Sequence, residues 1–263
     1  MIEIDFGRHS DDYVTHRPGF PASFYDRLEA IRPLAGRKVL DLGTGPGTVA
    51  LELARRGARV IGIDPAANQI NAAHRCAEKS GLSHLATFRV ARAEDFEAPD
   101  ESLDLVIAGQ SWWWFQQPQT MERIRRMLRP GGLLIVASFN YLPLIDPVAK
   151  ATEALVLQYN PHWPHAGDDG VYVRYLHQLT EANRFQFVEQ FCYDHDQPFT
   201  HESWRGRVRT CHAVGSGGLT AEQVESFDRE LAALLKRRFP QEPLMVKHRI
   251  YAVIVCRPEE DQA

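Results

Sequence analysis

Glycine recurs at every second position in a loop that follows a short strand-like run. The run Val39–Leu42 is apolar apart from Asp41, and the glycines that follow it are Gly43, Gly45 and Gly47. Because glycine has no Cβ, such a loop lets a ligand lie against the backbone. In open α/β sheets, ligands bind where strands end and helices begin, and a helix-competent segment follows this loop at once. The pattern therefore predicts a ligand-binding loop.

A second acid ends a second strand-like run. Asp64 follows the apolar residues Val60–Ile63. A carboxylate at this position can accept hydrogen bonds from both hydroxyls of a ribose. Asp64 could also cap a helix that begins near Ala66, since Asp is a favoured N-cap residue. The two roles are compatible.

The glycine spacing distinguishes between two nucleotide ligands. A dinucleotide fingerprint is Gly-x-Gly-x-x-Gly, whereas this loop is Gly-x-Gly-x-Gly. Asp41, two residues before the first glycine, is poorly placed to face a pyrophosphate. The spacing favours a nucleoside with a cationic or zwitterionic tail, and a nicotinamide-dependent oxidoreductase is the remote alternative.

Alternating strand-like and helix-like segments must position these residues. Between residues 37 and 140 the alternation predicts a parallel sheet covered by helices. The expected strands are 38–42, 59–63, 86–90, 103–109, 132–139, 185–194 and 248–256. The expected helices are 47–57, 66–80, 118–129 and 220–238, with a turn at 129–132. We predict an α/β fold, a Rossmann-like seven-stranded, mostly parallel sheet with helices on both faces and a helical or loop cap inserted after the fifth strand.

The same segments divide the chain into four expected parts. These are an N-terminal lid segment (1–36), a Rossmann-like cofactor-binding core (37–140), a substrate cap insertion rich in Pro, His, Trp and Tyr (141–182), and a segment that completes the sheet with a helical insertion (183–263).

In this order, the motifs resemble those of class I S-adenosylmethionine-dependent methyltransferases, whose first motif is acid-x-Gly-x-Gly-x-Gly. The resemblance covers most of the chain and is most specific between residues 39 and 140. The chain looks similar to bacterial small-molecule enzymes of the trans-aconitate methyltransferase-like group. The resemblance implies S-adenosyl-L-methionine as the cofactor and S-adenosyl-L-homocysteine as its product.

The resemblance also implies roles for residues at the strand ends. Asp41 and the glycine loop would hold the methionine end of the cofactor, Asp64 the ribose, and Ala93 with Glu94 the adenine edge. The expected cofactor-binding set is Tyr13, Arg17, Asp41, Gly43, Thr44, Gly45, Gly47, Asp64, Pro65, Gln69, Ala93, Glu94 and Gln110.

Several of these positions have a simpler interpretation. The glycine loop could be a tight turn alone, and Glu94 could belong to a solvated acidic loop. Tyr13 or Arg17 would meet the methionine carboxylate, although a surface arginine is the usual alternative. Gln69 stands where the family usually has an apolar residue against the adenine.

The residues at the end of the fourth expected strand limit the kinds of methyl transfer that we expect. Ala108–Gln110 offers no anionic ligand for a hard cation, so we expect no metal site. The segment also lacks the Asn/Asp-Pro-Pro-aromatic motif of amino-methylating nucleic-acid enzymes. These absences favour metal-independent methylation of a small molecule.

Aromatic and basic residues supply the expected substrate pocket. Trp112–Phe115 combines core residues with at least one ring that could face a sulfonium, and Trp113 replaces a histidine of the related enzymes. Residues 204–209 alternate like an extended strand, which would place their arginines on one face as an anion site, or leave them solvated. The expected pocket residues are Trp113, Tyr141, His162, Trp163, Trp204 and Arg205. The catalytic residues are unknown, with His162, His165 and His195 as weak candidates for a general base.

Composition sets the remaining expectations. The net charge of −4 gives no global attraction to nucleic acid or to an anionic membrane. The four scattered cysteines fit neither a zinc site nor a disulfide framework. The N-terminus has no signal-peptide pattern, and no apolar run approaches the roughly 20 residues of a transmembrane helix. We expect a cytoplasmic monomer or homodimer that acts on a small molecule and binds neither nucleic acid nor a membrane.

These observations favour O-methylation of a small organic acid or a phenol. Methylation at nitrogen or carbon is the nearest alternative. A cofactor-binding protein that does not methylate, such as an accessory subunit, a cyclase or a decarboxylase on the same fold, also remains open.

Overall fold

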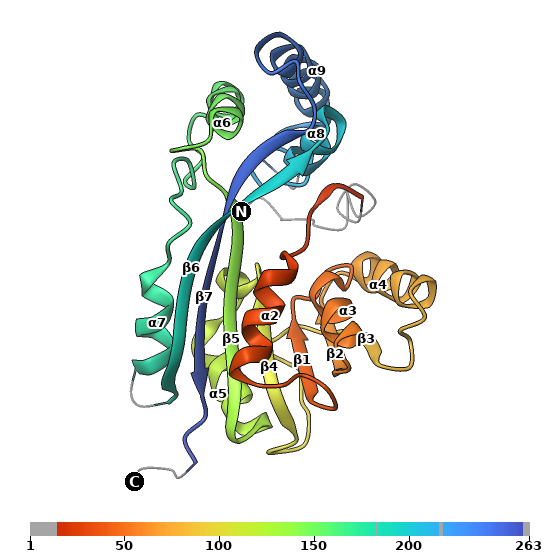
Figure 1. The fold of residues 1–263 in the computed structure, drawn as a ribbon, viewed down its shortest axis with the longest axis vertical. Coiled ribbons are helices and arrows are strands. Elements are labelled where there is room, and N and C mark those ends of the chain that lie inside the picture. Colours follow the sequence, from red (N-terminus) through yellow and green to blue (C-terminus); the bar gives the residue numbers. More distant parts are fainter. Residues whose placement is uncertain (1–14, 182–183, 216–217, 260–263) are drawn as a thin grey trace. The chain divides into compact units, whose positions relative to one another are not determined.

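The structure is a computed structural model that describes residues 15–181, 184–215 and 218–259 (Figure 1). The chain divides into two compact units. The sheet unit comprises Gly19–Phe139, Tyr172–Cys192 and Ile250–Ala263. The helical unit comprises Met1–Pro18, Asn140–Val171 and Tyr193–Arg249.

The sheet unit is built on seven strands in the order β3-β2-β1-β4-β5-β7-β6. The strands are β1 (Lys38–Leu42), β2 (Arg59–Asp64), β3 (Ala86–Val90), β4 (Leu103–Gly109), β5 (Leu128–Tyr141), β6 (Gln186–Phe199) and β7 (Leu244–Cys256). The pairs β1–β2, β1–β4, β2–β3 and β4–β5 are parallel. Hydrogen bonds exchanged between Arg257 and residues 131 and 132 fit an antiparallel β7. The predicted seven-stranded, mostly parallel sheet is confirmed.

Helices cover both faces of this sheet. On one face, Leu40, Val106 and Leu134 pack with residues of α5 (Gln117–Met127) and α7 (Val173–Thr180) in a single apolar cluster. On the other face, Phe24 of α2 (Ala22–Ile31) meets Phe191 of β6 edge to face. Strand residues alternate between the two faces because successive side chains point in opposite directions. Because helices cover both faces, side chains on either side of a central strand are buried, which explains why these strands are apolar throughout.

Two further helices connect the first three strands. They are α3 (Thr48–Arg55), between β1 and β2, and α4 (Ala67–Lys79), between β2 and β3. A short 3-10 helix, η1 (Trp112–Trp114), follows β4. The carboxyl ends of the parallel strands β1 and β2 are therefore followed by α3 and α4, as the sequence predicts, and the end of β4 is followed by η1, which the sequence analysis does not predict.

The helical unit contains α6 (Pro147–Tyr159), α8 (His201–Arg209) and α9 (Ala221–Arg238), which share an apolar cluster of their own. Asp146 caps α6 by accepting hydrogen bonds from the amides of Val148 and Ala149. Thr220 caps α9 through a capping box with Gln223. The predicted helix at 220–238 is thus confirmed.

Two local predictions are wrong. Residues 204–209 lie within α8 rather than in an extended segment, because Thr200 and Ser203 form a capping box that starts a helix there. The expected turn at 129–132 is part of β5, where the glycines allow the strand to bend and Gly131 takes a φ of 69°. Within the described ranges, no helix combines the length and apolar character needed to cross a membrane.

Candidate functional site

The glycine loop between β1 and α3 is built so that only glycine fits at two of its positions. Gly43 and Gly47 have φ values of 66° and 84°, in the left-handed region. A Cβ on Gly43 would lie 2.6 Å from the Cβ of Ser111, and a Cβ on Gly47 would lie 2.9 Å from the ring of Phe88. The loop therefore lies directly against Ser111, which follows β4, and against Phe88 of β3, and glycine permits this close packing.

Asp41 lies beneath this loop rather than on its surface. The carboxylate is buried, and its Oδ2 accepts a hydrogen bond of 2.6 Å from the hydroxyl of Thr44. Burial raises the pKa of Asp41 to about 7, against the opposing effect of hydrogen bonds from Thr44 and the backbone of Ala50. In this structure Asp41 holds the loop to the first turn of α3.

Asp64 joins the glycine loop to the start of α4. Its Oδ2 accepts from the amide of Gly45 over 3.0 Å, and its Oδ1 accepts from the amide of Ala66 over 2.9 Å. Burial raises the pKa of Asp64, although both amides oppose that rise. A carboxylate offers about four acceptor positions, so two remain for the hydroxyls of a ribose. The predicted capping role is wrong: the N-cap of α4 is Ala66, and Asp64 binds the amide of this residue before the helix begins. The ribose-binding role stays a prediction, and this geometry leaves room for it.

The residues predicted at the adenine end lie at the ends of β2 and β3. Gln69 is buried in the first turn of α4, two residues after the helix begins. Ala93 and Glu94 are buried in the loop after β3. Glu94 Oε1 accepts a 2.8 Å hydrogen bond from the amide of Gln116, so this side chain connects its loop to the start of α5.

Two polar residues follow β4: Gln110, which the sequence analysis predicts as part of the site, and Ser111, which it does not. Gln110 takes a left-handed φ of 63°, and its amide donates to the carbonyl of Ala137. The next residue, Ser111, is buried and donates from its hydroxyl to the carbonyl of Leu42 over 2.6 Å. Ser111 thus links the ends of β4 and β1 beside Gly43. Its only sequence signal is a small polar residue directly after an apolar strand.

The aromatic segment after β4 divides between core and surface. Trp112 is fully buried and meets the ring of Phe115 edge to face at 6.0 Å. Trp113 is partly buried against the same core cluster, and Trp114 is 41% exposed. At least one of these rings is core, as the sequence indicates.

Most of the expected substrate residues belong to the helical unit. Tyr13, an expected cofactor-binding residue, lies outside the described residues. Trp204 is buried and donates from Nε1 to the hydroxyl of Thr152 over 2.9 Å. Arg205 forms an ion pair with Asp228 instead of facing a shared arginine surface. Arg209, one helical turn later, binds the same carboxylate over 2.9 Å, whereas Arg207 is buried on another side of α8. The expected single arginine face does not exist, because the segment is helical.

The remaining candidates are distributed over the helical unit. Arg17 belongs to its N-terminal segment, where the ring of His16 fills the space beside Gly206 of α8. Tyr141 is buried at the end of β5. His162 and His165 are exposed on the loop after α6, and His195 is half-buried in β6. Their part in the reaction stays a prediction.

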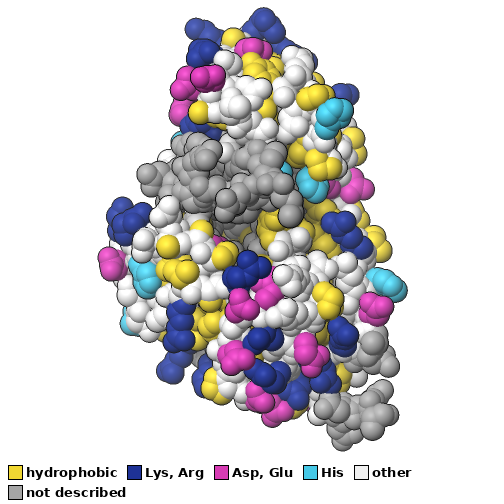
Figure 2. All heavy atoms as spheres, turned by 180° about the vertical axis from the view of Figure 1, so that it is seen from behind, with side chains coloured by type: hydrophobic (Ala, Val, Ile, Leu, Met, Phe, Trp, Pro, Cys, Tyr) yellow, Lys and Arg dark blue, Asp and Glu magenta, His cyan; other side chains and the backbone are white. Residues whose placement is uncertain are grey.

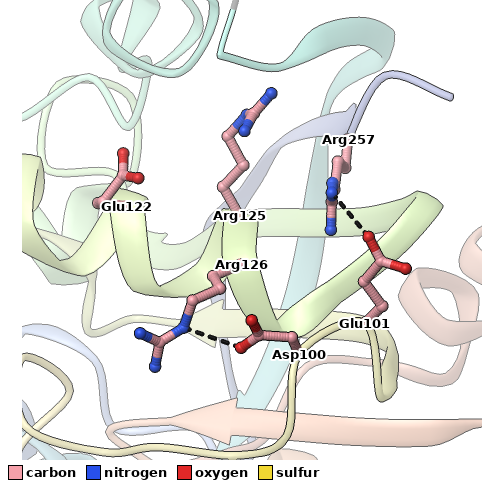
Figure 3. Close-up of a pocket in the computed structure, with 6 residues that line it drawn as sticks. All are labelled: Asp100, Glu101, Glu122, Arg125, Arg126 and Arg257. Carbon is pink, nitrogen blue, oxygen red and sulfur yellow. Dashed lines mark hydrogen bonds and ion pairs between the residues drawn. The ribbon is translucent and has the colours of Figure 1, made fainter. Parts of the chain in front are cut away.

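A surface pocket on the sheet unit lies at the opposite end of the parallel strands from the glycine loop. It is lined by Asp100, Glu101, Glu122, Arg125, Arg126 and Arg257 (Figure 3). Asp100 and Glu101 precede β4, whereas the glycine loop follows β1, which is parallel to β4. Ion pairs of 3.0 Å and 2.9 Å join Arg126 to Asp100 and Arg257 to Glu101. The three acids and three arginines compensate one another, so this pocket offers no net charge to a ligand.

Charged residues of both signs are mixed on the surface. Figure 2 shows Lys and Arg interspersed with Asp and Glu over the visible face, rather than gathered in a patch of one sign. Across the part of the chain that the structure describes, no group of three His, Cys, Asp or Glu side chains could hold a metal ion.

Comparison with known proteins finds a match to the central part of the chain. Residues 40–136 match the model of the methyltransferase domain. An uncharacterized methyltransferase of Mycobacterium tuberculosis is 33% identical over 133 residues, which are 51% of this chain and 51% of that protein. A ubiquinone biosynthesis O-methyltransferase of Cereibacter sphaeroides is 34% identical over 155 residues, 59% of this chain and 61% of the relative.

A solved structure extends the likeness to the whole fold. A candidate type II methyltransferase from Anaeromyxobacter dehalogenans superimposes with a TM-score of 0.64 at 24% identity, over 92% of this chain and 98% of that one. The sequence likeness to the two curated relatives spans only about half to three fifths of their length. The match to the methyltransferase domain, residues 40–136, contains the glycine loop, Asp64 and Glu94.

Proposed function

We propose that this chain, whose residues 40–136 are a methyltransferase domain of the class I type, transfers the methyl group of S-adenosylmethionine to a small molecule. The matched segment contains both acids and all three glycines of the site described above. The observation that carries the proposal is the bond between Gly45 and Asp64, because it holds beside the glycine loop a carboxylate that could accept hydrogen bonds from a ribose.

The residues present fit this cofactor. A Cβ at Gly43 would collide with Ser111 and one at Gly47 with Phe88, so glycine lets the loop pack closely on its neighbours while its backbone stays available to a ligand. Asp64 would bind the ribose hydroxyls, and the backbone of the loop would bind the methionine end. Ala93 and Glu94 would border the adenine. The bound cofactor supplies an electrophilic methyl group on a sulfonium.

The protein's own contribution would be mainly positional. Holding two reactants in the reactive orientation can lower a barrier by roughly 7–11 kcal/mol. Asp41, Thr44 and Ser111 make the glycine loop rigid by binding to it and to its neighbouring strands. A carboxylate acceptor would need no general base, whereas a hydroxyl acceptor would need a nearby proton acceptor.

We favour oxygen as the methylated atom. The likeness to an O-methyltransferase of ubiquinone biosynthesis supports this choice, together with the lack of an amino-methylating motif after β4. A small phenol or organic acid is the acceptor class that we propose.

An acceptor screen tests the proposal. The protein would be incubated with S-adenosylmethionine and a panel of phenols, hydroxy acids and amines, with mass spectrometry of both products. We expect release of S-adenosylhomocysteine together with the gain of one methyl group by a phenol or an acid. Methyl gain by amines alone would contradict O-methylation. Cofactor binding without S-adenosylhomocysteine release on any acceptor would support a non-methylating member of the fold.

A further inference from the structure

Two carboxylates border the glycine loop, and the protein does not neutralise either of them. Asp41 is 1% exposed, and its hydrogen bonds come from the hydroxyl of Thr44 and the backbone of Ala50. Asp64 accepts hydrogen bonds from two backbone amides. No Lys, Arg or His side chain in the described ranges forms an ion pair with these two acids. The loop is therefore bordered by negative charge for which a ligand can supply the cation.

Burial makes the ionised form of Asp41 costly, because buried charges are normally paired. The 2.6 Å hydrogen bond from Thr44 offsets part of this cost. Burial nevertheless raises the pKa of Asp41 to about 7, and the charge of Asp64 adds to the rise. Both forms of the Asp41 carboxyl group are therefore populated near neutral pH, and a cation placed close to it would favour the ionised form.

The charged and titratable groups of α2 and α3 near Asp41 do not supply that cation. Tyr25 of α2 is buried; burial raises its pKa, and the charges of Asp41 and Glu52 add to the rise. Two arginines at the end of α3 also act on Tyr25. Arg55 is paired with Glu52, and Arg56 is paired with acids of α2 and α3. Other carboxylates therefore already balance the charge of these arginines.

The cofactor and its product differ by one charge. S-adenosylmethionine carries a sulfonium cation, whereas the same sulfur atom of S-adenosylhomocysteine belongs to an uncharged thioether. The attraction between two opposite charges is several times stronger in a poorly solvated site than in bulk water. An ionised Asp41 therefore favours the cofactor over the product, and a protonated Asp41 does not.

We propose that Asp41 is the residue by which the glycine loop distinguishes S-adenosylmethionine, with its sulfonium cation, from S-adenosylhomocysteine, with its uncharged sulfur. The inference rests on the proposed function, because it concerns the cofactor of that reaction. An ionised carboxylate beneath the loop holds the product less tightly than the cofactor, which favours exchange of one for the other. The preference for the cofactor should rise with pH as Asp41 ionises.

Calorimetric titrations at about pH 5.5 and about pH 7.5 measure this preference. The probes are S-adenosylmethionine, S-adenosylhomocysteine and sinefungin, an analogue with a protonated amine in place of the methylated sulfur. We expect the ratio of the S-adenosylmethionine affinity to the S-adenosylhomocysteine affinity to rise about fivefold between the two conditions, because Asp41 is mostly protonated in the first and mostly ionised in the second. Sinefungin should follow S-adenosylmethionine. A ratio that does not change with pH would show that the proposal is wrong.

Proton release is a second readout, which comes from binding heats in buffers with different ionisation enthalpies. Near pH 6.5, S-adenosylmethionine should release about half a proton more than S-adenosylhomocysteine does, because the cation drives Asp41 to its ionised form. Asp41→Asn keeps the size of the side chain and should abolish both the extra proton and the rise of the affinity ratio. This variant also corrects for titration of the ligands' own amino groups. Folded Asp41→Asn that keeps the native pH dependence would contradict the proposal.

Two further variants assign the titration to Asp41. Thr44→Val removes the hydrogen bond that stabilises the ionised form, so the rise of the affinity ratio should move to higher pH. Asp104→Asn is the matched control, because this largely buried acid at the start of β4 is paired with Arg37 and Arg129. We expect it to leave the affinity ratio and its pH dependence unchanged. An unmoved rise in Thr44→Val, or its loss in folded Asp104→Asn, would overturn the assignment.

The inference and the proposed function fail in different ways. If both sulfur nucleosides bind and their affinity ratio is independent of pH, the proposed function stands and the role of Asp41 is wrong. If neither sulfur nucleoside binds at either pH, the proposed function is wrong and the role of Asp41 falls with it.

Discussion

The amide of Gly45 donates a 3.0 Å hydrogen bond to Oδ2 of Asp64, which joins the loop after β1 to the acid that ends β2. The two motifs are separate in the sequence but form one structure at the carboxyl ends of adjacent parallel strands. Asp64 also binds the amide of Ala66. Substitution of Asp64 should therefore affect both the ligand and the geometry of the loop.

Alanine at Gly43 should destabilise the protein more than alanine at a comparable glycine elsewhere. The left-handed backbone costs about 1–2 kcal/mol for a residue with a Cβ, and the close approach to Ser111 adds about 1–3 kcal/mol of overpacking. Gly81 is the matched control, because its φ is 68° and a Cβ there would meet nothing within 4 Å. Denaturant unfolding of Gly43→Ala and Gly81→Ala measures the difference. Equal losses would show that the loop can move away from Ser111.

Asp41→Asn should make the free energy of unfolding less sensitive to pH. Burial raises the pKa of Asp41 from 3.8 to about 7, so the folded state binds more protons than the unfolded state between these values. Stability of the native protein should therefore fall as pH rises through this range. Above pH 7 the full cost of burying the ionised Asp41 carboxylate is present. Because each pKa unit corresponds to about 1.4 kcal/mol, the variant should gain a few kcal/mol relative to the native protein between pH 4 and pH 8.

Unfolding measured at several pH values for both proteins tests this expectation. The difference between them isolates Asp41 from the other titrating groups. A constant difference across the range would contradict a carboxyl group that titrates near neutrality in the folded protein.

Asp228→Asn should loosen the contact between α8 and α9. Although burial raises the pKa of Asp228, hydrogen bonds from Arg205 and Arg209 lower it by more. A lowered pKa means that this contribution is complete above the ordinary Asp value and is lost as pH falls through the folded value. We expect the variant to lose about 1.5–3 kcal/mol at pH 7 and little at strongly acidic pH.

Glu202→Gln is the control for that prediction. Glu202 binds Arg205 and Arg209 as well, but its side chain is 62% exposed. Exposed ion pairs contribute about 0–1 kcal/mol. Equal destabilisation by the two substitutions in thermal or urea unfolding would contradict the structural role assigned to Asp228.

The sheet could be predicted because its signals are local. Each central strand is a short apolar run bounded by Gly, Pro or Asp, and parallel strands are buried on both faces. The glycine loop and Asp64 could be placed as well, since they stand directly at strand ends. Ser111 could not be found, because a single serine gives no signal until the chain brings it beside Leu42 and Gly43.

In the helical unit, the alternation of side-chain types at residues 204–209 led to a wrong prediction of an extended segment. The sequence from Trp204 to Arg209 alternates like a strand, and Gly206 weakens helix propensity. The capping box of Thr200 and Ser203, together with packing of His16 against Gly206, outweighs that pattern. The Asp146–Pro147 pair is a visible start signal for α6.

The most direct test of the central claim is calorimetric titration of the protein with S-adenosylmethionine, S-adenosylhomocysteine and NADH. We expect both sulfur nucleosides to bind and NADH not to bind. Asp64→Asn should weaken both by about 10- to 100-fold through loss of charged hydrogen bonds to the ribose, whereas Asp100→Ala, at the opposite end of the parallel strands, should bind like the native protein. Failure of the native protein to bind either sulfur nucleoside, or equal binding by folded Asp64→Asn, would contradict the account.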